Sequence, residues 1–331
     1  MMFKRALEDG HNRRVSYVRI SVTDRCNLRC RYCTAPAFFD RQPLEILSYE
    51  EIVKVAEVLV GMGIDKIRLT GGEPLVRRHL DKLIARLAGI YGINDISLTT
   101  NGVLLGKLAR PLWQSGLRRV NISLDSLRRQ RFLEITGRDY FNQVRGGIEA
   151  ALEVGFSPVK INVVVMRGVN DDELADFAEL TMHRPLQVRF IEYMPIGSSS
   201  EWRENKVVTG ARILERISRD YGPPEEVPAE LGGPARLYRL SGSQGRIGVI
   251  TPLSNHFCAA CNRIRITADG RLRPCLLSDN EYDLKKVLRS GGDEAAIAAL
   301  FRQAVASKLA EHALACNAER KCTRLMSTIG G

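Results

Sequence analysis

The sequence predicts an α/β protein in which an open, partial (β/α)6 TIM-like barrel is followed by a C-terminal module. Short β-branched runs alternate with longer helical stretches from residue 17 to about residue 195, which is typical of βα units around a parallel sheet. There are six such units, fewer than the eight that close a full barrel. After Pro195 the pattern changes, because glycine- and proline-rich connectors separate shorter strand-like segments.

The elements of the barrel follow in order along the chain. Strands are expected at residues 17–22, 66–70, 95–100, 118–124, 159–165 and 186–191. Helices are expected between them, at residues 48–60, 80–88, 104–115, 144–154 and 172–182. Ser48 with Glu51 three residues later forms a capping-box pattern, which marks the start of the first helix.

The C-terminal part has a different order of elements. The sequence predicts a helix at residues 211–220, strands at 236–240, 246–251 and 263–267, and a long helix at 294–312. Ala268-Asp269-Gly270 is predicted to be a hairpin turn. We therefore divide the chain into a barrel at residues 1–200 and a C-terminal module at residues 201–331.

Composition limits the classes of function. The chain has 331 residues, of which 44% are hydrophobic and 26% charged, as in folded proteins. No apolar run approaches the roughly 18–20 residues of a membrane helix, and the start lacks the apolar stretch of a secretory signal, so a cytoplasmic protein is expected. The net charge of +11 indicates either an anionic partner or a basic surface that aids solubility. Because the arginines are scattered and many lie at strand ends, a charged pocket fits better than a duplex-binding face.

Six of the eight cysteines form two tight triplets, which favours metal ligands over disulfides in a reducing compartment. Cys26, Cys30 and Cys33 follow the first strand at its carboxyl end, where parallel α/β sheets place active sites. Three thiolates can hold three irons of a [4Fe–4S] cluster and leave one iron without a protein ligand. A zinc knuckle that lacks one ligand is the alternative. Cys316 and Cys322 stand apart and are interpreted as buried or incidental thiols.

The first triplet and a glycine pair carry a resemblance to a known superfamily. Residues 26–33, CNLRCRYC, resemble the cluster loop of radical S-adenosylmethionine (SAM) enzymes, and Gly71-Gly72-Glu73-Pro74 matches the stretch that contacts the SAM amino group in them. Glycines let a backbone approach a ligand closely, and proline stiffens the turn. The resemblance implies that the free iron binds the methionine part of SAM. It also implies that one electron cleaves SAM to a 5′-deoxyadenosyl radical.

The second triplet, Cys258, Cys261 and Cys275, also leaves one iron open if it holds a [4Fe–4S] cluster. A structural zinc site with His256 as the fourth ligand is the alternative. The residues from 262 to 275 resemble the GTP 3′,8-cyclases of molybdenum cofactor biosynthesis. This resemblance covers nearly the whole chain and includes residues 19–25, 66–70, 99–102, 121–126, 159–162 and 189–195. Two departures, Thr34-Ala35-Pro36 and Ala259-Ala260, remove no ligand.

The family resemblance implies a set of binding residues around the barrel mouth. The SAM contacts would be Tyr32, Gly72, Ser123 and Met194. The GTP contacts would be Arg19, Arg68, Thr99, Lys160, Arg189, Arg263, Ile264 and Arg265. Most of these are basic, and guanidinium groups bind phosphate oxygens in a bidentate manner. The resemblance implies roles in catalysis for Arg263 and Arg265. It implies the same for the terminal Gly330 and Gly331, because the tail of relatives reaches into the site.

The resemblance also implies a reaction and its partners. The radical removes a hydrogen from ribose C3′ of GTP, and the C3′ radical attacks guanine C8 to give (8S)-3′,8-cyclo-7,8-dihydroguanosine 5′-triphosphate. The open iron of the second cluster would hold the guanine base against C3′. Implied partners are a second copy of the chain, a low-potential electron donor and cyclic pyranopterin monophosphate synthase, which takes the product. Neither nucleic acid nor a membrane is expected as a partner.

Two other functions compete with the cyclase. A radical SAM enzyme that modifies peptides would also carry auxiliary clusters, although such enzymes usually have more C-terminal cysteines than this chain. A non-catalytic zinc- or RNA-binding protein would explain the basic charge, and it predicts bound zinc and salt-dependent RNA binding.

Overall fold

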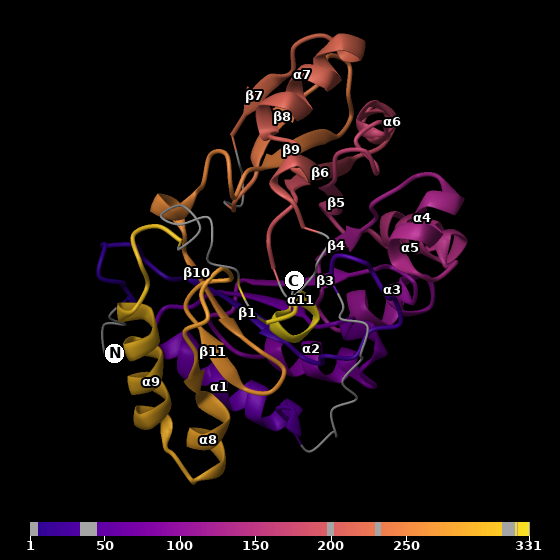
Figure 1. Ribbon diagram of the computed structural model, residues 1–331. Helices are drawn as coiled ribbons and strands as arrows, with labels where there is room; N and C mark the ends of the chain where they lie inside the picture. Colours follow the sequence, from indigo (N-terminus) through magenta and orange to yellow (C-terminus); the bar gives the residue numbers. More distant parts are fainter. Residues whose placement is uncertain are drawn as a thin grey trace.

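The computed structural model describes residues 6–33, 45–196, 202–228, 233–312, 322 and 324–330. Its strands, in chain order, are β1 (Tyr17–Ser21), β2 (Lys66–Thr70), β3 (Asp95–Thr100), β4 (Arg119–Ser123), β5 (Val159–Val165), β6 (Leu186–Glu192), β7 (Glu225–Val227), β8 (Arg236–Arg239), β9 (Arg246–Ile250), β10 (Arg263–Ile266), β11 (Arg271–Arg273) and β12 (Tyr282–Asp283). They form one twelve-stranded sheet in the order β12-β11-β10-β1-β2-β3-β4-β5-β6-β9-β8-β7. This sheet is strongly curved (Figure 1).

Strands β1 to β6 pair in parallel, each with the next, as the (β/α)6 prediction requires. The connecting helices are α1 (Tyr49–Gly61), α2 (Leu80–Ala88), α3 (Leu105–Gln114), α4 (Arg129–Thr136), α5 (Phe141–Val154) and α6 (Leu174–Glu179). The predicted open barrel is confirmed. The short helix α4 was not predicted, because its apolar pattern is weak. The helix predicted at residues 172–182 is shorter, since only Leu174–Glu179 is helical.

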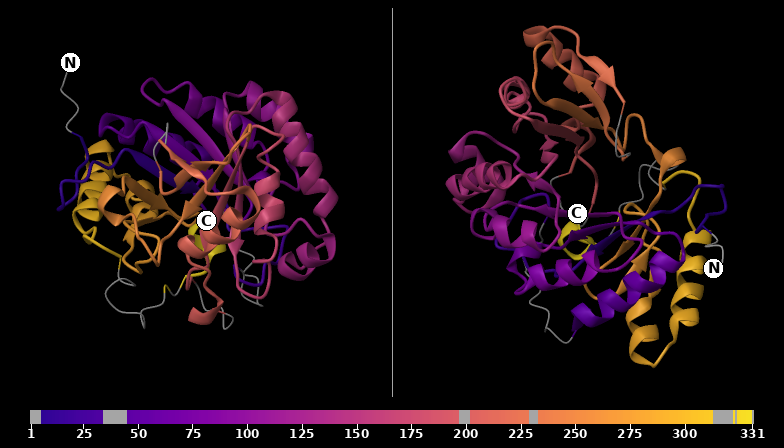
Figure 2. Two further views of the ribbon diagram at one scale, coloured as in Figure 1. Left: turned by 90° about the horizontal axis from the view of Figure 1, so that it is seen from above. Right: turned by 180° about the vertical axis from the view of Figure 1, so that it is seen from behind.

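The strands of the C-terminal part extend the barrel sheet at both of its edges. Strand β9 pairs in parallel with β6, and β10 pairs in parallel with β1. At one end lies α7 (Gly210–Tyr221) with β7–β9; at the other, α8 (Leu284–Arg289) and α9 (Glu294–Ala306) lie beside β10 and β11 (Figures 1 and 2). The helix predicted at residues 294–312 ends earlier, at Ala306. The C-terminal part therefore lies at both edges of the barrel sheet, and α11 (Met326–Ile329) lies between these two edges.

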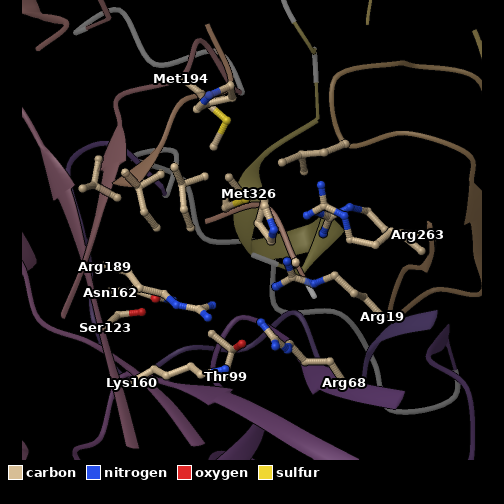
Figure 3. Close-up of a pocket in the computed structure, with 18 of the residues that line it drawn as sticks. Arg19, Arg68, Thr99, Ser123, Lys160, Asn162, Arg189, Met194, Arg263 and Met326 are labelled. Carbon is tan, nitrogen blue, oxygen red and sulfur yellow. The ribbon is translucent and has the colours of Figure 1, made fainter. Parts of the chain in front are cut away.

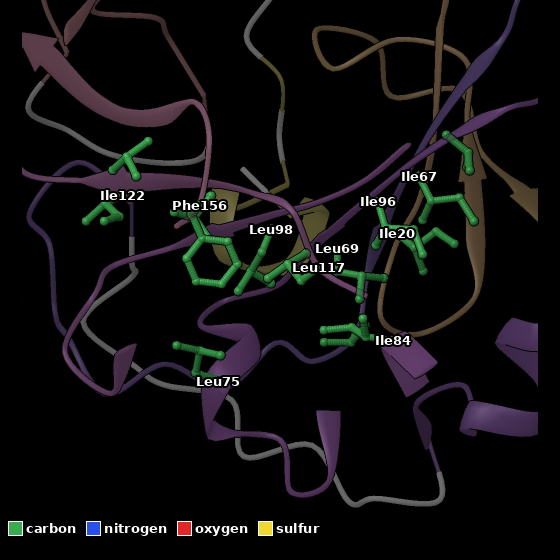
Figure 4. Close-up of a cluster of buried hydrophobic side chains, with 14 of the residues drawn as sticks. Ile20, Ile67, Leu69, Leu75, Ile84, Ile96, Leu98, Leu117, Ile122 and Phe156 are labelled. Carbon is green, nitrogen blue, oxygen red and sulfur yellow. The ribbon is translucent and has the colours of Figure 1, made fainter. Parts of the chain in front are cut away.

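Alternation along each strand separates the core from the interior of the barrel. Ile20, Ile67, Leu69 and Leu98 are buried and pack with α2 residues such as Ile84 (Figure 4). The residues between them on the same strands are polar and line a cavity on the other face. A closed (β/α)8 barrel fills this space with bulky aliphatic side chains. Here the polar lining leaves room for ligands.

Two local signals in the sequence are confirmed in the structure. Ser48 caps α1, since its hydroxyl accepts from the Glu51 amide at 3.1 Å and its own amide donates to the Glu51 carboxylate at 2.7 Å. Gly270 has φ of +76° in the turn between β10 and β11, a conformation that glycine adopts without strain. Within the described residues, no helix has the length and apolar character needed to cross a bilayer.

Candidate active site

A cavity of about 320 Å³ lies inside the barrel. All six cysteines of the two triplets contribute to its lining. So do residues of β1 to β6 and β10, with Arg19, Arg68 and Arg263 on one side and Lys160, Asn162 and Arg189 on the other (Figure 3). The topology explains this convergence, because parallel strands bring their carboxyl ends to one edge of the sheet. The two triplets, more than 200 residues apart in sequence, thus face one space.

The loop that carries the first triplet is held by its backbone. The amides of Arg29 and Arg31 donate to the carbonyls of Thr136 and Ile135, at 2.8 and 3.0 Å, at the end of α4. Burial raises the pKa of Cys26 to about 11, and burial with the neighbouring Cys26 raises that of Cys33 to about 12. Binding of iron must therefore displace protons from these thiols.

The glycine pair packs directly on the start of this loop. A Cβ atom on Gly72 would lie 2.4 Å from the carbonyl oxygen of Arg25, so no larger residue fits without movement of the backbone. The Gly72 amide donates to Thr23 at 2.7 Å, and the Glu73 amide donates to Arg25 at 2.8 Å. From the sequence, these glycines were expected to let the backbone approach a ligand closely. The structure adds a second reason, which is close packing of two backbones.

Glu73 is a functional candidate that the sequence analysis named only as part of a motif. Its fully buried carboxylate accepts from the Thr100 hydroxyl at 2.7 Å and the Asn101 amide at 2.6 Å. The Asn101 side chain in turn donates to Asn27 at 2.7 Å and lies 3.8 Å from the Cys26 sulfur. Burial raises the pKa of Glu73 to about 7. This chain of hydrogen bonds connects the ends of β2 and β3 to the first triplet.

Asp125 is a second residue that sequence reasoning missed. The Tyr32 hydroxyl donates to its carboxylate at 2.6 Å, and the Val164 amide donates at 2.8 Å. Burial raises the pKa of Asp125 to about 6. Its position directly after β4, two residues beyond Ser123, was a usable signal. All four expected SAM contacts, Tyr32, Gly72, Ser123 and Met194, line the cavity.

The expected GTP contacts form a basic wall in the same cavity. The residues that line it are Arg19, Arg68, Thr99, Lys160, Arg189, Arg263 and Arg265. Burial and the nearby charge of Arg263 lower the pKa of Arg265 to about 10, and burial with Arg68 lowers that of Arg189 to about 9. Burial and mutual repulsion destabilise the charged form of guanidinium groups that lie close together. An anion bound among them would therefore be strongly stabilised.

Ile264 is the exception among these residues. It pairs with Val18 in the sheet and its side chain is fully buried in the hydrophobic core, on the face away from the cavity. Alternation along β10 accounts for this, because Arg263 and Arg265 take the cavity face. The same alternation adds Tyr17, Asn162 and Arg119 to the lining, none of which was predicted as a site residue. Arg119 forms an ion pair with Asp95.

The second triplet lies in more basic surroundings than the first. Although burial raises the pKa of Cys261, the nearby Arg263 and Lys308 lower it to about 7. Lys308 is buried beside the Cys261 sulfur, at 3.9 Å. His256, the ligand of the zinc alternative, lies 3.5 Å from the Glu311 carboxylate and packs edge-on against His312. Among the described residues, no three His, Cys, Asp or Glu side chains gather closely enough to hold a single metal ion.

The described part of the C-terminal tail lies inside the barrel. The Gly330 carbonyl accepts from Arg265 at 2.9 Å, and a Cβ atom on Gly330 would lie 2.4 Å from the Thr70 hydroxyl oxygen. Its φ of +87° also favours glycine. Gly331 and Cys316 lie outside the described residues. Cys322 is buried, as predicted, and its sulfur accepts a hydrogen bond from the Arg273 guanidinium at 3.3 Å.

Comparison with known proteins identifies the family of the chain. Residues 20–181 match the family model of the radical SAM superfamily, and residues 186–314 match the model described as Molybdenum Cofactor Synthesis C. The chain is 51% identical over 327 residues to the GTP 3′,8-cyclase of Moorella thermoacetica, covering 98% of this chain and all of that one. It is 49% identical to the enzyme of the same name from Pelotomaculum thermopropionicum, with the same coverage.

A solved structure is similar in fold alone. SuiB of Streptococcus suis, in a crystal structure with bound S-adenosylmethionine, matches with a TM-score of 0.60 and 15% identity. The match covers 88% of this chain and 69% of SuiB. Together with the family models and the full-length relatives, these findings place the chain in the GTP 3′,8-cyclase family of the radical SAM superfamily.

Proposed function

We propose that the chain performs the GTP 3′,8-cyclase reaction of its family with two ligands side by side in the barrel cavity. SAM would lie at the first triplet, against Tyr32, Gly72, Ser123 and Met194. GTP would lie between the basic wall and the second triplet. The single observation that carries this proposal is that both triplets and the basic wall line one cavity.

The donor sets fit the family's cofactors, two [4Fe–4S] clusters and SAM. Each triplet offers three thiols and so leaves one iron of a cluster for a small-molecule ligand. When bound, the first cluster and SAM supply the radical that removes hydrogen from ribose C3′ so that C3′ can attack guanine C8. This is the first step of molybdenum cofactor biosynthesis.

The basic wall would fix the triphosphate. Arg19, Arg68 and Lys160 project into the cavity from β1, β2 and β5, so they can bind phosphate oxygens from several directions (Figure 3). Arg263 and Arg265 come from β10, next to Cys261, and would bind the nucleotide near the second triplet. Holding GTP at both ends keeps C3′ and C8 in reacting positions, which removes much of the entropic barrier.

The remaining residues would shield the reaction. The tail lies between the two ends of the sheet, with Gly330 bonded to Arg265. A tail in this place restricts access of water and stray hydrogen donors to the radical. We also propose Gly331 as part of this shield. We keep the division into a barrel at residues 1–200 and a C-terminal module at 201–331 as a proposal.

The partners are likewise proposed. The reaction needs two electrons from a low-potential donor, one to cleave SAM and one that enters with a proton to reduce the radical left after ring closure, and its product passes to cyclic pyranopterin monophosphate synthase. A homodimer in the cytoplasm is the expected setting. None of these partners is required for the chemical test that follows, because dithionite can supply both electrons.

The test is an anaerobic incubation of the iron-reconstituted protein with GTP, SAM and dithionite, followed by mass spectrometry of the nucleotide. We expect a product with the mass of GTP, since cyclisation is an isomerisation, that separates from GTP in chromatography and forms with 5′-deoxyadenosine. Iron analysis should give about eight irons per chain. A single zinc per chain, or 5′-deoxyadenosine without a new nucleotide, would refute the proposal.

A further inference from the structure

Lys308, just beyond the end of α9, contacts the segments that carry two cysteines of the second triplet. Its ammonium donates to the carbonyl of Arg263 at 3.0 Å and to that of Pro274 at 2.9 Å. Arg263 follows Cys261 by two residues, and Pro274 directly precedes Cys275. The lysine is only 6% exposed. One side chain therefore connects two ligand-bearing segments that are separated in sequence.

The charge of Lys308 also needs an explanation. A buried ammonium group is costly unless an anion or several acceptors stabilise it. Among the described residues, no carboxylate forms an ion pair with Lys308, and its ammonium lies 3.9 Å from the Cys261 sulfur. A cluster bound by three thiolates is an anion. The positive charge of the buried lysine and the negative charge of such a cluster would therefore stabilise each other.

The same segment reaches the third cysteine through an arginine from the N-terminal end of the chain. One amino group of Arg13 donates to the carbonyls of Cys258 and Ala310, both at 2.8 Å, and the other donates to Leu309 at 2.6 Å. Residues 308–310 are therefore hydrogen-bonded, directly or through Arg13, to the chain segments that carry all three cysteines of the second triplet. Lys308 is the member of this set that also faces a cysteine sulfur.

From these contacts we infer that Lys308 is a positioning residue of the second cluster: it holds the Cys261 and Cys275 segments at the spacing the cluster needs and neutralises part of its charge. The inference rests on the proposed function, since it requires a cluster at the second triplet. It assigns two separable roles to one side chain. Hydrogen bonds to the two carbonyls govern retention of the cluster, and the positive charge governs its reduction potential.

Two variants separate these roles. Lys308→Met keeps the length of the side chain but cannot donate, whereas Lys308→Gln can still donate and carries no charge. Lys54→Met is the matched control, because Lys54 also donates to a backbone carbonyl, that of Gly292 at 3.2 Å, but is exposed. Each protein is reconstituted anaerobically and assayed for iron content, for the electron paramagnetic resonance (EPR) signals of both clusters, and for GTP-independent SAM cleavage.

We expect the methionine variant to fall from about eight irons to about four and to lose only the second EPR signal. The glutamine variant should keep both signals, with the second cluster reduced at a lower potential than in the wild type. SAM cleavage should persist in both variants, which shows that the barrel is folded. Unchanged iron content and potential in both variants would overturn the inference. A wild type with about four irons would instead overturn the proposed second cluster, and with it this role for Lys308.

Discussion

The two cysteine triplets face one cavity, yet their surroundings carry opposite charge. Near the first triplet lie the carboxylates of Glu73 and Asp125, and burial, followed by neighbouring acidic groups, raises the pKa of Cys30 well above its usual range. Near the second triplet lie Arg263 and Lys308, which bring the pKa of Cys261 down to about 7 against the effect of burial. Burial acts in the same direction at both cysteines, so the neighbouring charges make the difference.

This difference matches the charges of the two ligands proposed for the cavity. SAM carries a positively charged sulfonium group, so a site with two carboxylates suits it. GTP carries a triphosphate, so a site lined with guanidinium and ammonium groups suits it. A cavity divided in this way opposes exchange of the two ligands between sites. The comparison predicts that damage to either side should affect one ligand and spare the other.

The largest effects are expected from the cysteines. Cys30→Ala should abolish reductive SAM cleavage, because the first cluster loses a ligand, and no cyclised nucleotide should form. Cys261→Ala should retain SAM cleavage to 5′-deoxyadenosine but also form no cyclised nucleotide. Chromatography of both products in the same anaerobic reaction measures this contrast. If Cys30→Ala still cleaves SAM, or Cys261→Ala does not, the two triplets do not have separate roles.

The sequence predicted the barrel well because each of its elements has a local signal. Strand β2 was predicted at its observed bounds, and the start of α1 was marked by the pair Ser48 and Glu51. The triplets were found for a similar reason, since each lies within a short stretch of chain. Ile264 shows the limit of a match by motif. It lies in the right stretch, but alternation turns its side chain into the core.

Long-range contacts could not be predicted in the same way. Nothing in the local pattern around residue 308 indicates that a lysine beyond a helix end reaches Pro274. Pairing of β9 and β10 with opposite edges of the barrel also depends on the whole sheet, not on either strand. Asp125 was missed because its role follows from the Tyr32 hydroxyl, which is distant in sequence.

A smaller effect is expected on the basic side. Replacing Arg263 and Arg265 together with alanine should weaken GTP binding about a hundredfold or more, because a hydrogen bond to a charged group contributes about 1.5–3 kcal/mol. SAM cleavage without GTP should be largely unchanged. Equilibrium binding of GTP to the reconstituted protein measures the first effect. The double lysine variant is the control, since it keeps the charge but loses the bidentate geometry, and should lie between the two. Unaltered GTP affinity in the alanine variant would remove the basic wall from the model of binding.

The smallest change tests the acidic side. Tyr32→Phe keeps the aromatic ring, which packs edge-on against Tyr193, and removes only the hydroxyl that donates to Asp125 at 2.6 Å. Loss of one hydrogen bond to a buried carboxylate corresponds to about 1.5 kcal/mol, so the KM for SAM should rise about tenfold. GTP affinity should stay within about twofold of the wild type, since the basic wall is untouched.

The pH dependence of this variant sharpens the test. Burial raises the pKa of Asp125 to about 6 although the Tyr32 hydroxyl favours its charged form, so removal of that hydroxyl raises the pKa further. Protonation then begins at a higher pH in the variant. The ratio of KM values, variant over wild type, should therefore increase as the pH falls from 8 toward 6.5. A ratio that stays constant across this range would mean that the charge of Asp125 contributes nothing to SAM binding, and the electrostatic division of the cavity would then rest on its basic side alone.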